Sequence, residues 1–312
     1  MSMELRPLSL GELLDRSFTL YRRHFITFVG IMAVPAAVTL LFSLSSQLVP
    51  HRAAQTASTL NPVSAGWIMT GALFGMMLLL AYVLAYMVAL GATTAAVSEL
   101  YLDRPITIAG AYAQMRGLKG SLMILMLLTG LRVLGAILVT LLVIGIIMGI
   151  FGSGAPFLGG LLAILTGLAG FVLVMLMTLR YALAVPALTL EPLSPSEAIR
   201  RSVDLTRGNV WRVFVLTIFA SIITYISVMI FQVPLLTAAM IAGPESAASF
   251  WLNLAAAVTG AIASAISGPI MIIALAVLYY DVRIRHEGLD LQIMMEKLGA
   301  TPAVPPSGAF PA

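Results

Sequence analysis

The chain has 312 residues, of which 60% are hydrophobic and only 10% are charged, and it contains no cysteine. Soluble domains carry about 25% charged residues, so this composition excludes an ordinary soluble protein and predicts an integral membrane protein. The absence of cysteine excludes disulfides and thiolate chemistry, and we interpret the net charge of +4 as a sign of membrane topology rather than of nucleic-acid binding.

Six apolar segments follow a polar, amphipathic stretch of residues 1–24. Each is long enough to cross a bilayer, which takes about 20 helical residues. The first is longer than the apolar core of a signal peptide, so it is predicted to remain in the mature chain. Glycine, proline and polar residues divide two longer apolar blocks. The predicted spans cover about 25–49, 67–98, 121–150, 156–190, 211–242 and 248–280 of a single membrane domain, residues 1–298, and a disordered tail is predicted at 299–312.

The basic residues are divided unequally between the two sides of these spans. Fifteen of the 17 fall in residues 1–24, 99–120, 180–212 and the segment after 280, whereas Arg52 lies on the other side. Cytoplasmic loops retain lysine and arginine, so both chain ends are predicted to lie in the cytoplasm and the protein in the cytoplasmic (inner) membrane. An odd number of spans would destroy this division.

Residues 8–22 and 193–207 repeat each other, with leucine, serine, glutamate and arginine in register. Each copy precedes two spans, and a weaker third copy begins at 106–108. The fold class is therefore predicted to be an all-α integral membrane protein, with six transmembrane helices as three hairpins, each preceded by a cytoplasmic interfacial amphipathic helix. Serine and glutamate three residues apart predict a capping box at the start of a helix. The predicted capping residues are Ser9, Glu12, Ser194 and Glu197.

The predicted surface helices carry arginines that are candidate contacts for anionic lipid headgroups: Arg16, Arg22, Arg201 and Arg207. A basic residue near an anionic membrane surface contributes about 1 kcal/mol to binding. The alternative is that these arginines only fix the topology, as basic clusters beside spans commonly do. The predicted partners are membrane lipids with anionic headgroups, and no nucleic acid.

Arg132 is the one basic residue within a predicted span. Counted from Lys119, it lies about 20 Å along a helix, which places it near the middle of a hydrocarbon core of about 30 Å. Arginine inside a membrane usually faces a partner or a wet cavity. Arg132 is therefore a further candidate contact for a lipid phosphate or an anionic substrate, and snorkelling or structural pairing are the alternatives.

The sequence offers little catalytic chemistry. Its three histidines lie in different polar segments, and His51 falls across the membrane from the other two, so no metal site is predicted. Acidic residues on the cytoplasmic side stand close to basic ones, which favours salt bridges over paired catalytic carboxylates. We therefore predict that the protein is not an enzyme and has no catalytic residues, metal or cofactor.

Several segments resemble a known family: residues 6–16, 197–202, 205–212 and 278–285. Through them, residues 5–290 resemble the membrane domain of glycerophosphoryl diester phosphodiesterases, a bacterial family that also includes stand-alone membrane proteins. In members that carry the enzyme, a barrel domain with a His-Arg-Gly motif follows the membrane part, and this sequence contains no such tripeptide. The resemblance implies the membrane architecture, in a stand-alone member that lacks the catalytic domain.

Three functions remain open from the sequence. The first is a non-enzymatic protein that binds or organises lipid or partner proteins at the cytoplasmic membrane face, which accounts for the repeated surface helices. The second is a transporter or channel for an anionic solute or lipid, which accounts for Arg132. The third is a membrane subunit of a glycerophosphodiester phosphodiesterase system, which rests on the family resemblance alone.

Overall fold

The computed structural model describes residues 8–48, 62–101, 104–243 and 246–288, and these residues form helices and no strand. Six of the helices are long and apolar enough to cross a membrane, which confirms the predicted all-α membrane fold. The helices are α1 (Leu10–Arg23), α2 (Phe25–Leu48), α4 (Pro62–Tyr101), α5 (Ile108–Gln114), α6 (Lys119–Phe151), α7 (Pro156–Tyr181), α8 (Ala184–Leu190), α9 (Pro195–Thr206), α10 (Val210–Ala242) and α11 (Ala247–Glu287).

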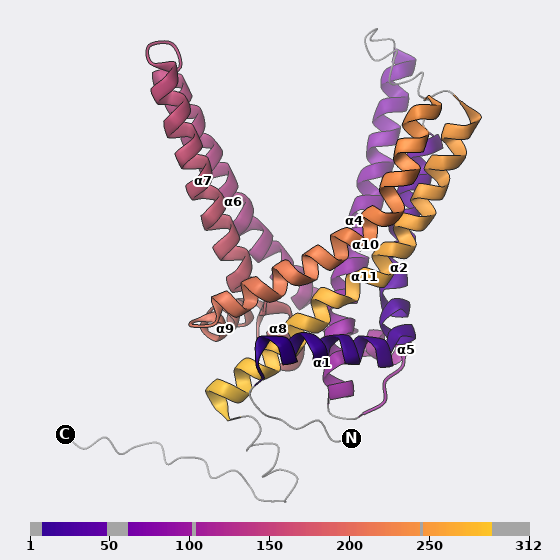
Figure 1. Ribbon diagram of the computed structural model, residues 1–312, viewed down its shortest axis with the longest axis vertical. Coiled ribbons are helices and arrows are strands. Elements are labelled where there is room, and N and C mark those ends of the chain that lie inside the picture. The colour runs from indigo at the N-terminus through magenta and orange to yellow at the C-terminus, as the bar shows by residue number, and fades with distance from the viewer. Residues whose placement is uncertain (1–7, 49–61, 102–103, 244–245, 289–312) are drawn as a thin grey trace, which may run out of the picture.

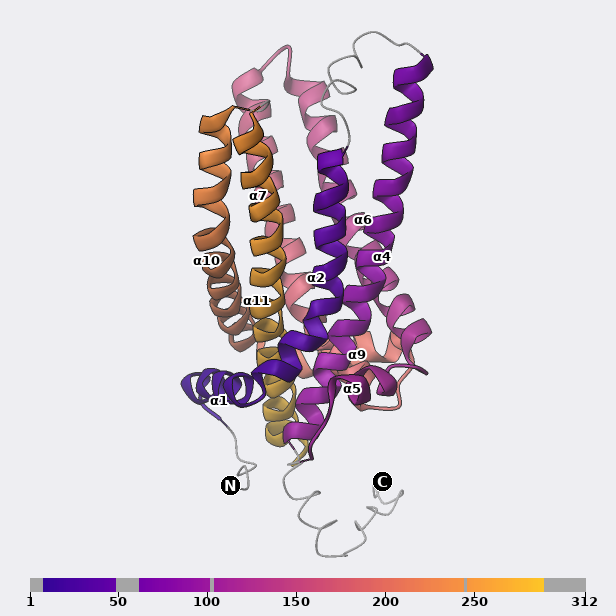
Figure 2. The same cartoon turned by 90° about the vertical axis from the view of Figure 1, so that its right-hand side faces the viewer.

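The long helices pair as three hairpins, α2 with α4, α6 with α7 and α10 with α11, and a short helix precedes each pair (Figure 2). The segment predicted as one span at 156–190 is divided into α7 and α8 by a break at Ala182 and Leu183. The third long helix starts at Lys119 and the second starts at Pro62, so both helices extend beyond the predicted spans.

Side-chain caps start the three short helices that precede the hairpins, α1, α5 and α9. Ser9 Oγ accepts from the Glu12 amide and Glu12 Oε2 accepts from the Ser9 amide, at 3.3 and 2.7 Å. The same box forms between Ser194 and Glu197, at 3.4 and 2.8 Å. At α5, which lies in the weaker third copy, Thr107 Oγ1 accepts from the amide of residue 110 at 3.1 Å. Each cap satisfies amides that the first turn of a helix leaves unpaired, so the repeated motif marks helix starts.

Each short helix packs on a hairpin other than the one that it precedes. Helix α5 lies on α2 and α4 of the first hairpin, α9 lies on α6 and α7 of the second, and α1 lies chiefly on α11 of the third (Figure 1). The three units therefore close into a ring, in which each short helix covers the hairpin of the preceding unit.

Hydroxyl groups tie this ring together through backbone carbonyls of the long helices. Tyr21 donates to Ile266 O, Tyr112 to Ile31 O and Ser202 to Arg180 O, each at 2.6 Å. The Ile31 carbonyl needs this donor because Pro35, four residues later, has no amide hydrogen. Burial raises the pKa of the Tyr21 and Tyr112 hydroxyls to about 12, so both remain donors at neutral pH.

The buried core lies at the end of the molecule where the short helices gather. We call this end the base layer: α1, α5, α8, α9 and the parts of the long helices that pack against them. Its largest fully buried side chains include Leu13, Phe28, Leu122, Leu205 and Tyr279. Away from the base layer, the hairpin of α6 and α7 diverges from the other four long helices (Figure 1). In the most apolar part of α6 no residue is buried, compared with 61% of the residues in that of α11.

Candidate functional site

Asp281 on α11 is fully buried and is held by three donors. Its carboxylate accepts from the Leu8 amide at 2.6 Å, and its Oδ2 lies 2.9 Å from Arg212 Nη1 and 3.1 Å from Arg285 Nε. The two guanidinium groups also donate to the Leu8 carbonyl, at 2.7 and 2.6 Å. Burying a charge is costly unless it is paired and hydrogen-bonded, and this cluster meets both needs. It fixes Leu8, two residues before α1, against the third hairpin.

A second ionic cluster joins the segment between α8 and α9 to α11. Glu191 accepts from Arg201 Nε at 3.2 Å and from the Tyr279 hydroxyl, and Glu287 pairs with Arg201 and with Arg283, whose Nε lies 2.9 Å from it. Two carboxylates and two guanidinium groups thus balance in charge. Burial alone would lower the pKa of Arg201. The hydrogen bond to Glu287 and the charges of both glutamates outweigh burial, so this pKa is raised above its ordinary value. Arg201 therefore pairs with carboxylates of the base layer, although its side chain is partly exposed.

Arg16 occupies the position in the first repeat that Arg201 occupies in the second. Its Nη1 donates to the Tyr101 hydroxyl at 3.1 Å, and its guanidinium group lies 5.0 Å from the centre of that ring. Tyr101 stacks on Tyr280 with ring centres 4.8 Å apart, and the Tyr280 hydroxyl is 2.6 Å from Ser98 Oγ. Cation–π contact and stacking of this kind hold α1 against the ends of the first and third hairpins.

The other predicted contacts are exposed and lie apart. Arg22 and Arg23, at the end of α1, line a surface depression of about 300 Å³ together with Thr19. Arg207 follows α9 on another side of the base layer. Arg132 is exposed on α6. The structure thus separates the five predicted arginines into two that make internal contacts, Arg16 and Arg201, and three that face outwards, Arg22, Arg132 and Arg207.

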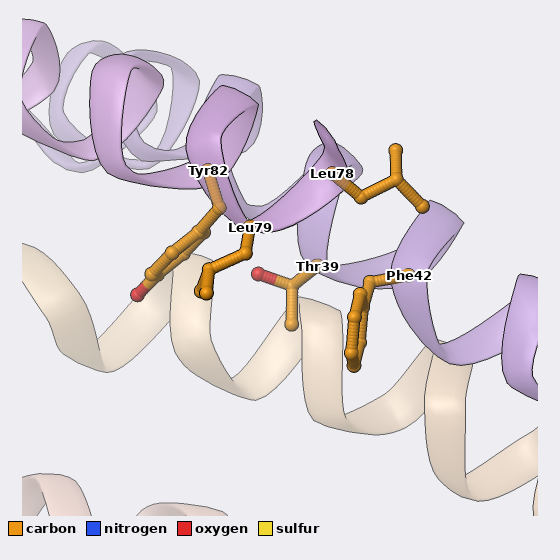
Figure 3. Close-up of a pocket in the computed structure, with 5 residues that line it drawn as sticks. All are labelled: Thr39, Phe42, Leu78, Leu79 and Tyr82. Carbon is orange, nitrogen blue, oxygen red and sulfur yellow. The ribbon is translucent and has the colours of Figure 1, made fainter. Parts of the chain in front are cut away.

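Two apolar pockets lie along the hairpins. One, of about 120 Å³, lies between α2 and α4 and is lined by Thr39, Phe42, Leu78, Leu79 and Tyr82 (Figure 3). The other has a volume of about 410 Å³ and lies where α6, α7 and α8 meet. Within the described residues, no group of three histidine, aspartate or glutamate side chains is placed to hold a metal ion.

The family resemblance can now be placed on the structure. Residues 157–297 match the family model for the membrane domain of glycerophosphoryl diester phosphodiesterase. The match shows that this part of the chain is similar to that membrane domain. The match covers α7 to α11, and the resemblance that we drew for the earlier residues lies outside it. No curated protein and no solved structure gives a significant match.

All residues of the two ionic clusters except Leu8 lie within the matched range. Arg212, Asp281, Arg283 and Arg285 stand in the segments that carried the resemblance in the sequence. Sequence reasoning predicted salt bridges for the cytoplasmic acids but could not assign partners, because Asp281 and Leu8 are 273 residues apart. The sequence signal for these clusters was the recurrence of acidic and basic residues at the ends of the hairpins. In the structure these residues form ion pairs that hold the helix ends together.

Proposed function

We propose that this multi-pass membrane protein acts without catalysis and binds anionic lipid headgroups at the cytoplasmic face of the inner membrane. The observation that carries the proposal is the end of α1. There, the exposed Arg22 and Arg23 line a depression, and Phe25 and Ile26, the first two residues of α2, are 40% and 80% exposed. An interfacial anchor combines a basic side chain at the level of the headgroups with apolar side chains at the level of the acyl chains.

The ionic clusters support a role other than catalysis. A general acid or base needs a carboxylate that is free to reach a substrate. Asp281, Glu191 and Glu287 instead direct their oxygens to arginines, a tyrosine hydroxyl and a backbone amide. Their geometry is suited to holding the base layer rigid, and this rigidity would present the exposed arginines at a fixed height.

The test compares lipid retention in matched variants. Protein in nanodiscs of phosphatidylcholine and phosphatidylglycerol is released into the gas phase, and the phosphatidylglycerol molecules that stay bound are counted by native mass spectrometry. Arg22→Gln with Arg23→Gln is expected to lose bound phosphatidylglycerol. Arg104→Gln with Arg116→Gln removes two exposed charges elsewhere in the base layer and is the control. Equal retention in the two double variants would refute the proposal.

Two other functions each keep one supporting observation. Transport of an anionic solute or lipid is supported by the exposure of Arg132 on α6, and liposomes that neither take up the solute nor scramble lipid would remove it. A membrane subunit of a phosphodiesterase system is supported by the match at residues 157–297. Co-purification with a soluble glycerophosphodiester phosphodiesterase from the native membrane would favour this third function.

A further inference from the structure

The register between α6 and α7 sets the height of Arg132. A side chain at residue 170 would collide with Thr140, and one at residue 159 would touch Phe151, so these residues face each other across the hairpin. Extended towards the base layer, this antiparallel register places Arg132 level with Thr178, two residues from Arg180. Residues 129 and 130 of α6 and residues 178 and 181 of α7 line one pocket, as this register requires.

The number of residues between Arg132 and the far end of α6 favours a height at a membrane surface over one at the middle of the membrane. Nineteen residues separate Arg132 from Phe151, where α6 ends, and at 1.5 Å per residue they span about 28 Å. The hydrocarbon core is about 30 Å thick, so this part of α6 is long enough to cross nearly all of it. Before Arg132, Leu122 and Leu125 of α6 are buried in the base layer, whereas Met123, Ile124, Leu127 and Leu131 are exposed. The count from Lys119 alone led to the expectation of a central position.

Arg132 also stands where α6 separates from the rest of the protein. Leu125, Leu128 and Arg132 follow one face of the helix, at intervals of three and four residues. Leu125 is buried and Leu128 packs on the core, whereas Arg132 is exposed. Farther along the same face, the exposed side chains include Val139, Val143, Ile146 and Ile150. We call this place at Arg132, where the α6–α7 hairpin begins to diverge from the other long helices, the vertex; it is at the end of the hairpin away from its turn.

The vertex combines a cation with an apolar pocket. The pocket of about 410 Å³ extends from residue 125 to residue 133 on α6, directly beside Arg132. Its threonines, Thr129 and Thr178, donate to carbonyls of their own helices, so they leave the pocket apolar. No hydrogen bond or ion pair joins Arg132 to another residue of the described ranges. A cation at the surface level of the membrane therefore faces lipid without a protein anion.

We propose that the vertex is a specific site for one anionic phospholipid, with its phosphate on Arg132 and an acyl chain over the pocket between α6, α7 and α8. The height of Arg132 matches that of a lipid phosphate, and the open apolar face beyond it suits acyl chains. The proposal deepens the proposed lipid binding, but it uses a different surface from the end of α1, and the two can fail separately.

The height is tested first with a spin label. The chain has no cysteine, so Leu131→Cys, at a position that is 62% exposed, gives a single labelling site beside Arg132. Oxygen and nickel-chelate accessibility in bilayers should place the label at the level of the phosphates, close to a label introduced by Arg180→Cys. A label at Leu131→Cys that lies near the bilayer centre would overturn the proposal.

The lipid is tested with three variants in phosphatidylglycerol nanodiscs. Arg132→Gln should lose one retained phosphatidylglycerol per chain in native mass spectrometry, and Arg132→Lys should keep most of it. Arg180→Gln is the control, because Arg180 is exposed at the same height but lies on the side of α7 opposite to Thr178 and the pocket. Full retention by Arg132→Gln would overturn the proposal.

Two further outcomes identify the source of the anion and separate the two lipid proposals. Millimolar glycerol phosphate should leave the retained lipid in place, and displacement by it would refute the lipid as occupant and favour a soluble anion. If Arg22→Gln with Arg23→Gln loses lipid while Arg132→Gln does not, the proposed function stands and the vertex site is refuted. If only Arg132→Gln loses lipid, the vertex site stands and the binding at α1 is refuted.

Discussion

Arg212 at the start of α10 lies 2.9 Å from Asp281 near the end of α11, and both side chains also bind Leu8, the residue that leads into α1. The contact therefore joins the two ends of the third hairpin to the N-terminal segment. Asp281 is fully buried, and its carboxylate pairs with both Arg212 and Arg285.

We expect Asp281→Asn to destabilise the protein strongly. Removal of one partner from a buried ion pair costs about 3–5 kcal/mol, and the 16% and 35% exposure of the Arg212 and Arg285 side chains places the expected loss at the lower end of that range. The measurement is denaturant unfolding in mixed micelles, with Asp204→Asn, an exposed acid on α9, as the control. Equal stability of the two variants would show that the cluster does not support the fold.

Arg201 and its neighbour Arg200 allow a closely matched comparison. Arg201 pairs with Glu191 and Glu287, whereas Arg200 is exposed. The Arg201 side chain is 27% exposed, so solvent weakens its pairs and Arg201→Ala should cost about 1–3 kcal/mol. Arg200→Ala should change the unfolding free energy by less than about 0.5 kcal/mol. If instead Arg201→Ala leaves the stability unchanged but lowers lipid retention, Arg201 is a lipid contact as first predicted from the sequence.

The caps of α1 and α9 should contribute equally, because they are the same motif. Ser194→Ala and Ser9→Ala each remove a side-chain acceptor from the first turn, at a cost of about 1 kcal/mol. Ser194→Asp keeps an acceptor oxygen and should retain most of the stability. Thermal unfolding in detergent measures all three, and a Ser194→Asp variant as unstable as Ser194→Ala would argue against the cap.

The same box predicts a pH dependence. Hydrogen bonds from the Ser194 hydroxyl and amide lower the pKa of Glu197 below its ordinary value. A carboxylate with a lowered pKa in the folded state stabilises that state above its unfolded pKa, and the contribution disappears as the pH falls through the folded pKa. Stability measured from pH 7 down to pH 3 should therefore fall less steeply in Glu197→Gln than in the natural chain. Parallel curves would exclude Glu197 as a source of the dependence.

The sequence predicted the six helices, their pairing and the starts of the short helices, because these depend on apolar length and on local capping chemistry. It could not predict which hairpin a short helix covers. The bond from Tyr112 to the carbonyl that Pro35 leaves free is made over 81 residues and has no periodic signature. The height of Arg132 likewise depends on how the first turns of α6 pack, and the sequence of α6 does not show that Leu122 and Leu125 are buried in the base layer.

The ring arrangement predicts that α1 lies beside α10 of the third hairpin, although the two helices are far apart in the sequence. Phe18 on α1 lies edge-to-face against Phe219 on α10, with ring centres 6.5 Å apart. Because the chain has no cysteine, Phe18→Cys with Phe219→Cys places the only two thiols at this contact, and a short bifunctional thiol reagent should join them within one chain. The control is Thr19→Cys with Phe219→Cys, since Thr19 is exposed on a different side of α1. Cleavage between the two positions followed by electrophoresis detects the link. Equal linking of both pairs, or links found only between chains, would refute the closure of the ring by α1.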